Sequence, residues 1–133
     1  MKNLLTLVLL IFSLNAPAQN QASENEKTRL EYETADKELN QVYQKILNDY
    51  KADKKFIANM KTAQRAWMAF RDAELKALYP AQDGRLEYGS AFPMCWNIAL
   101  IELTRERTKQ LKKWTEGIPE GDVCAGSVKR ADR

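Results

Sequence analysis

Apolar residues recur at steps of three and four positions along three long stretches of the chain, with polar and charged residues between them. This spacing is typical of an amphipathic α-helix. The first stretch predicts a helix over roughly 24–50. Ser23 and Glu26 form a capping-box pattern that would start this helix. Thr34 is a point where it could bend or divide into two shorter helices.

The other two stretches predict two more helices with a loop between them. The second stretch predicts a helix over roughly 53–79, which Pro80 would end. Residues 80–89 carry turn signals and form the longest predicted loop within the domain. The third stretch predicts a helix over roughly 90–116. With no strand pattern in the chain, the fold class is all-α, a small antiparallel bundle of about three helices.

The start of the chain has the features of a secretory signal peptide. A basic first segment precedes an uncharged apolar run over 4–12, and the small residues Ala16 and Ala18 follow. We expect a signal peptide over 1–18, cleaved before Gln19, and a bacterial protein that is periplasmic or secreted. The apolar run is short for a membrane span, so no stable span is expected after cleavage, although an uncleaved anchor is the alternative.

The rest of the chain divides into a domain and a tail. We expect one helical domain over 19–121 and a flexible tail over 122–133, because the tail has no apolar period. Removal of Lys2 with the signal peptide lowers the formal net charge from +3 to +2. Charges this close to balance create no strong field for nucleic acid, so no nucleic-acid partner is expected.

Both cysteines, Cys95 and Cys124, lie in the part of the chain expected to be exported. An even number of cysteines in an oxidising compartment predicts one intramolecular disulfide between them. Two free thiols, or a bridge between two chains, are the alternatives.

The residue types present argue against catalysis. The chain has no histidine, which removes the commonest general base and the commonest metal ligand. It also has no glycine-rich phosphate loop and no nucleophile elbow. We therefore expect no enzyme activity, no metal and no cofactor.

Polar residues that lie among the apolar ones predict an inter-helix network. Arg71 is expected to stack near Trp67 and to pair with Asp36 or another carboxylate, since a buried arginine needs a partner. A direct binding role for the same residues is the alternative. The predicted network consists of Asp36, Asn40, Gln64, Trp67, Arg71, Asp72 and Arg107.

Several of these residues belong to an ordered set of short segments. The set comprises residues 34–43, Gln64-Arg65-Ala66-Trp67, Phe70-Arg71-Asp72, Gly89-Ser90, Cys95 and Thr104-x-x-Arg107. Over roughly 30–114 it resembles the LprI-type family, small exported bacterial domains named for a mycobacterial lysozyme inhibitor. The chain departs from the family pattern at Leu75, where members often carry a cysteine, so the resemblance makes Cys124 a replacement partner for Cys95.

The resemblance implies a lysozyme-inhibitor-like binding protein whose partner is lysozyme or another envelope protein. The loop after the second helix offers suitable groups for such a partner. Arg85 could meet an acidic site, Tyr88 could stack on a sugar-binding surface, and Ser90 could form hydrogen bonds. The alternative is a structural or interaction module of the envelope that binds a protein or peptidoglycan.

Overall fold

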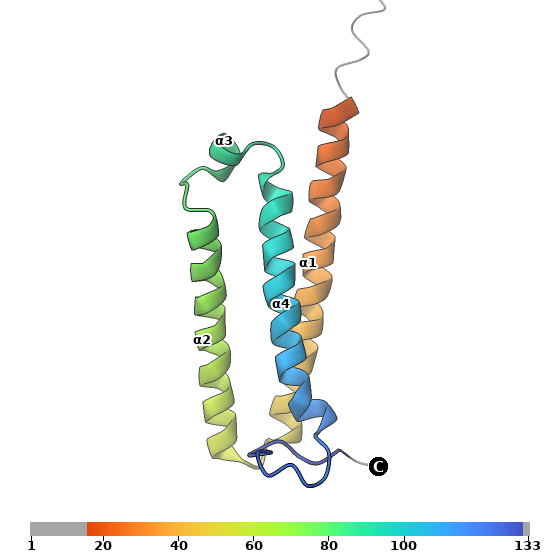
Figure 1. Cartoon of the computed structure of the whole chain (residues 1–133), viewed down its shortest axis with the longest axis vertical. Helices are drawn as coiled ribbons and strands as arrows, with labels where there is room; N and C mark the ends of the chain where they lie inside the picture. The colour runs from red at the N-terminus through yellow and green to blue at the C-terminus, as the bar shows by residue number, and fades with distance from the viewer. Residues whose placement is uncertain (1–15, 132–133) are drawn as a thin grey trace, which may run out of the picture.

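The computed structural model describes residues 16–131, which form four helices. These are α1 (Ala16–Asp49), α2 (Lys54–Leu78), the short α3 (Gly84–Tyr88) and α4 (Phe92–Glu116). The long helices reverse direction from one to the next, so α1 and α4 run parallel and α2 runs against both (Figure 1). The all-α prediction is confirmed, and the expected count of three helices is short by α3.

Helix α1 is longer than predicted. It begins at Ala16, so Ser23 lies inside it and the predicted capping box does not start it. It also continues through Thr34, whose hydroxyl donates to the Leu30 carbonyl within the helix at 2.9 Å. The apolar run of the predicted signal peptide lies outside the described residues. Among the described helices, none is both long enough and apolar enough to cross a membrane.

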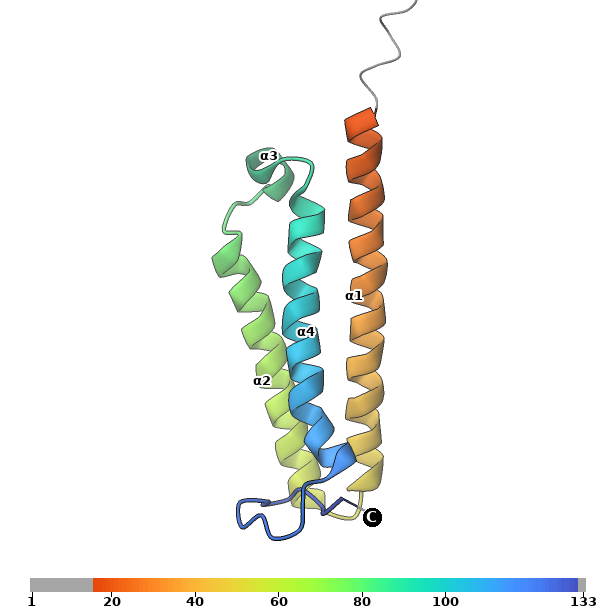
Figure 2. The same ribbon diagram turned by 45° about the vertical axis from the view of Figure 1, so that its right-hand side comes forward.

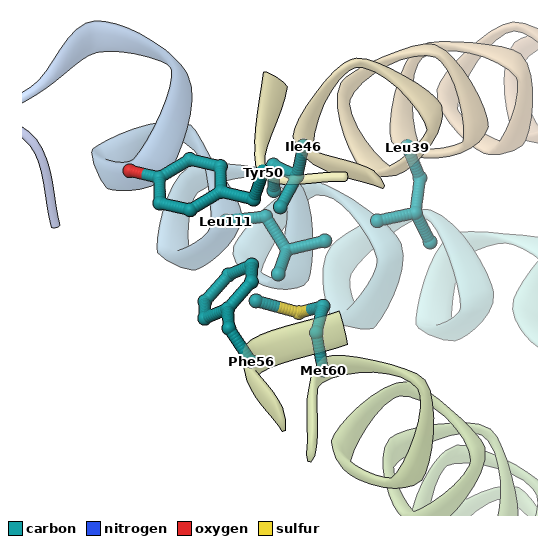
Figure 3. Close-up of a cluster of buried hydrophobic side chains, with 6 residues drawn as sticks. All are labelled: Leu39, Ile46, Tyr50, Phe56, Met60 and Leu111. Carbon is teal, nitrogen blue, oxygen red and sulfur yellow. The ribbon is translucent and has the colours of Figure 1, made fainter. Parts of the chain in front are cut away.

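The hydrophobic core lies where the three long helices meet, near the turn between α1 and α2. Figure 3 shows the six buried side chains converging: Leu39, Ile46, Tyr50, Phe56, Met60 and Leu111. Ile46 and Leu111 are completely covered. Burying each aliphatic side chain of this kind contributes about 1.5–3 kcal/mol to stability. This end of the bundle therefore holds the three helices together.

Two ion pairs fix the parallel register of α1 and α4. Arg105 Nη2 lies 2.9 Å from Glu31 Oε1, and one heptad further Lys112 Nζ lies 2.8 Å from Glu38 Oε1. All four side chains are exposed to a large degree, so each pair contributes only about 0–1 kcal/mol. Helix α4 runs beside α1 over most of its length in both views (Figures 1 and 2).

The segment predicted to be a flexible tail follows a defined path as far as residue 131. It forms a loop that returns to the turn between α1 and α2 (Figure 2). The Lys129 amide donates to the Tyr50 hydroxyl at 3.1 Å, and Trp114 Nε1 donates to the Ser127 hydroxyl at 3.0 Å. Ile118 and Arg130 form an isolated bridge. Hydrogen bonds that involve side chains of the helices or of this segment attach it to the bundle, and such bonds leave no hydrophobic period in a sequence.

Candidate functional site

Four aromatic side chains gather where α2 is connected to α4 through α3. Tyr79 lies at the centre of this cluster. Its ring centroid is 5.5 Å from that of Tyr88, 5.4 Å from that of Phe92 and 5.9 Å from that of Trp96. The first two contacts are edge-to-face, the geometry that the quadrupoles of aromatic rings favour. We call this group the aromatic end of the bundle.

Helix α3 covers this cluster because of local sequence features. Asp83 caps it by accepting a hydrogen bond from the Leu86 amide at 3.0 Å, and Gly89 ends it with a positive φ of 80°. At Gly84 a Cβ atom would lie 2.3 Å from two carbons of the Phe92 ring. A glycine at this position is therefore what lets the backbone of α3 lie against Phe92.

A recess of about 550 Å³, open to solvent on one side, lies at the aromatic end. Aromatic rings, two cations and two amides line it, among them Tyr79, Phe92, Trp96, Lys76, Arg85, Gln82 and Asn97. Neither Lys76 nor Arg85 has a hydrogen bond or ion pair to any described side chain. Flat apolar faces beside free N–H donors can hold a ligand that combines rings or sugars with carboxylates.

Burial raises the pKa of the Tyr79 phenol above its usual value, with smaller contributions from Cys95 and Tyr88 in the same direction. Tyr79 therefore keeps its proton throughout the physiological range. The recess then presents a neutral phenol beside two cations, so it is suited to binding an anion rather than to acid–base chemistry at neutral pH.

The structure places the three predicted loop residues at this end, in different positions. Arg85 lies on α3 at the edge of the recess. Tyr88 packs its ring on Tyr79 and Phe92, and its hydroxyl accepts a hydrogen bond from the Ala81 amide at 3.3 Å. Ser90 lies just outside, and its carbonyl accepts a hydrogen bond from Asn25 of α1 at 3.1 Å. Their part in binding stays a prediction.

The residues of the predicted inter-helix network fall into separate groups. In one group, Arg107 Nε of α4 donates to Gln64 Oε1 of α2 at 3.1 Å, and Gln64 is buried. Burial of Arg107 lowers the pKa of its guanidinium. This contact links α2 to α4 just beyond the core.

In a second group, Arg71 lies over the Trp67 ring, with its Cζ 5.4 Å from the ring centroid. Its carboxylate partner is the neighbouring Asp72, at 2.8 Å, and not Asp36. Asp36 instead accepts a hydrogen bond from Asn40, one turn along α1, at 3.0 Å. Arg71 therefore stacks on Trp67 and pairs with a carboxylate as predicted, but that carboxylate is Asp72 of the same helix, and Asp36 makes its contact within α1.

The two cysteines are free thiols, so the predicted disulfide between Cys95 and Cys124 is not formed in this structure. Cys95 lies in the first turn of α4, whereas Cys124 lies in the returning loop beyond its last residue, Glu116. The helix between them rises about 30 Å. A disulfide needs Cα atoms within about 7 Å, and an even cysteine count contains no information on that distance.

Sequence reasoning missed most of the recess. The site predicted from the sequence contains none of the lining residues Lys76, Tyr79, Gln82, Phe92, Trp96 and Asn97. A signal was present, because aromatic residues occur on both sides of the predicted loop, and a helical hairpin brings the two sides together. Within residues 16–131 no cluster of potential metal ligands occurs.

Comparison with known proteins identifies the family. The profile of the family described as "Lysozyme inhibitor LprI" matches residues 14–111. The chain belongs to the LprI lysozyme inhibitor family. It is also 34% identical, over 98 residues, to an uncharacterised protein of Rhizobium meliloti (strain 1021), an overlap that covers 65% of this chain and 67% of that protein. No solved structure matches the chain.

Proposed function

We propose that this protein is an exported, lysozyme-inhibitor-like binding protein whose working surface is the aromatic end. The observation that carries this proposal is the recess with unpaired Lys76 and Arg85 at its edge. Membership of the LprI family supports inhibition rather than catalysis. In this proposal the working surface does not include residues 64–72 of α2, although that segment carries much of the family resemblance.

The chemistry of the proposed target fits these groups. Muramidases cleave glycans with a pair of carboxyl groups in a sugar-binding cleft. A guanidinium such as that of Arg85 can form two parallel hydrogen bonds with one carboxylate. The aromatic rings of the recess offer flat apolar faces of the kind that stack on sugar rings. The protein has a slightly basic balance of charges, as animal lysozymes do, so affinity would come from this local match rather than from long-range attraction.

Export rests on the first eighteen residues. We propose cleavage before Gln19, which would remove the apolar run and the first three residues of α1. The rest of α1, including Glu31 and Glu38 that pair with α4, would stay in the mature protein. Intact-mass measurement of the protein recovered from the periplasm tests this, and a mass that includes residues 1–18 would contradict it.

The test of function is an inhibition assay against several muramidases of animal and bacterial origin. We expect inhibition of at least one of them by the purified protein. Arg85→Ala should weaken inhibition by about 30-fold or more, the usual effect of removing an arginine that anchors an interface. No inhibition of any muramidase at high micromolar concentration would sink the proposal.

Another exposed arginine, far from the aromatic end, provides a matched control. Arg65 is also an exposed arginine, but it lies in the middle of α2, where its guanidinium donates to the Thr62 hydroxyl at 3.1 Å. Arg65→Ala should leave inhibition unchanged. If Arg65→Ala and Arg85→Ala weaken inhibition equally, general positive charge and not the aromatic end would be responsible.

Peptidoglycan itself is a second candidate partner, in line with an envelope interaction module. The amides of Gln82 and Asn97 beside aromatic rings favour it, because sugars are bound by stacking together with amide hydrogen bonds. Sedimentation with purified peptidoglycan distinguishes the two candidates. Binding to peptidoglycan without inhibition of any muramidase would favour this candidate over the inhibitor.

A further inference from the structure

Two separate hollows lie between α2 and α4, apart from the aromatic recess. The lower hollow, of about 400 Å³, lies near the core, and its lining includes Phe56, Ala63 and Trp114. The upper hollow, of about 460 Å³, lies nearer the aromatic end and has Leu78 and Leu103 in its lining. Within the described part of the chain no helix covers either hollow.

Exposed apolar side chains connect the two hollows. Phe70 is seven positions after Ala63 and four before Glu74, so the three share one face of α2. Ala63 lines the lower hollow and Glu74 the upper one, which places Phe70 between them. Phe70 is 53% exposed and Leu78 57% exposed. We call the two hollows together with Phe70 the α2/α4 furrow.

The charge of the furrow changes sign along its length. Glu74, Glu102 and Glu106 line the upper hollow, and none of them has an ion pair to a described residue. Glu102 and Glu106 are four positions apart on α4, a like-charge spacing that destabilises a helix. No ion pair or side-chain hydrogen bond within residues 16–131 offsets this repulsion, so we look for the partner of these carboxylates outside the chain.

The lower hollow has the opposite charge. Lys55 and Arg107 line it, and Lys113 Nζ lies 4.2 Å from the centroid of the Trp114 ring in its wall. Its one acidic residue, Asp53, is already engaged as the N-cap of α2, where it accepts the Phe56 amide. The furrow thus has an acidic upper end, an apolar middle and a basic lower end.

We propose that the α2/α4 furrow is the interface of an antiparallel homodimer. In a twofold-symmetric interface, residue i of one copy meets residue j of the other, and j meets i. A surface that is acidic at one end and basic at the other complements itself only when the two copies run in opposite directions. Two α2/α4 pairs facing each other form a four-helix bundle, in which apolar furrow residues become the core.

Sedimentation of the protein expressed from the complete sequence tests this proposal. A reducing agent is included, because the exposed Cys124 thiol could otherwise link two chains. We expect a monomer–dimer equilibrium whose dissociation constant rises with salt. Phe70→Ala should raise that constant by about tenfold or more, with no change in the monomer's melting temperature, because Phe70 is exposed in the monomer.

Charge reversal gives the sharper test. The double variant Glu102→Lys/Glu106→Lys makes both ends basic, and Lys55→Glu/Lys113→Glu makes both ends acidic. Each alone should dimerise at least about tenfold more weakly, and an equimolar mixture of the two should form a heterodimer again. Glu26→Lys/Glu33→Lys, which makes the same charge change on exposed α1 positions, should dimerise like the unaltered protein.

Three results would overturn the proposal. The first is a protein that stays monomeric up to roughly 1 mM, the weak end of the ordinary affinity scale. The second is a dimer whose dissociation constant is the same for the unaltered protein, Phe70→Ala and the charge-reversed variants, which would place the interface elsewhere. The third is a mixture of the two charge-reversed variants that does not associate.

Discussion

The core end and the aromatic end of the bundle are both rich in large apolar side chains, yet they use them differently. At the core end, side chains from all three long helices meet and are covered, with Ile46 and Leu111 fully buried. At the aromatic end, the rings pack on one another but leave one side open to a recess with two unpaired cations. Packing explains the first arrangement completely. It leaves the free cations of the second without a role, which is why we place binding there.

The largest predicted effect is the difference in stability between truncating a buried leucine at the core end and truncating an exposed leucine at the aromatic end. Leu111→Ala should lower the free energy of unfolding by about 2–5 kcal/mol, because it leaves a cavity where three helices meet. Leu86 on α3 is 85% exposed, and Leu86→Ala should change that free energy by no more than about 0.5 kcal/mol. Urea denaturation of both variants measures the difference, and similar losses would mean that stability is not concentrated at the core end.

The next effect tests how the aromatic end is assembled. Gly84→Ala places a Cβ against the Phe92 ring and should cost about 1–3 kcal/mol, with a change in the near-ultraviolet circular dichroism of the aromatic cluster. Replacing Phe92 by leucine in the same chain shortens the side chain that clashes. Gly84→Ala/Phe92→Leu should therefore lose less stability than the two single changes added together, and simple additivity would contradict the contact.

Arg71→Ala tests whether the middle of α2 is structural. Arg71 is only 17% exposed and stacks on Trp67, so we expect a loss of about 1–2 kcal/mol, seen as a lower melting temperature. Arg105, which is 57% exposed in its pair with Glu31, is the matched control and should lose less than about 1 kcal/mol. An unchanged melting temperature for Arg71→Ala together with lost partner binding would assign Arg71 to the working surface.

The smallest effect is a dependence on alkaline pH. The pKa of Tyr79 is raised in the folded protein, so the folded state holds the phenolic proton more tightly than the unfolded chain does. The stability contributed by Tyr79 is therefore complete below about pH 10 and is lost as the pH rises through its folded pKa. Tyr79→Phe should show a smaller fall in melting temperature above about pH 10. An identical fall in both proteins would contradict this.

The three long helices could be predicted from sequence because hydrophobic period is a property of neighbouring residues. The five-residue α3 is too short to show a period, so the sequence predicts a loop there. The Ser23–Glu26 cap failed for a related reason, since residues 16–22 before it continue the helix. Within the site, Arg85 was predicted from its loop, but the recess depends on Lys76 and Trp96 meeting across twenty positions. That meeting depends on the packing of α3 against α4 and on the contact between the Tyr88 and Tyr79 rings just beyond α2, which are tertiary contacts.

Hydrogen–deuterium exchange of the protein, alone and with the muramidase it inhibits, tests the central claim most directly. The claim that the aromatic end is the working surface predicts new protection across residues 79–97 when the enzyme is added. Residues 39–50, which carry the core side chains Leu39, Ile46 and Tyr50, should exchange as before. Protection confined to residues 64–72, or no new protection across 79–97, would contradict the account.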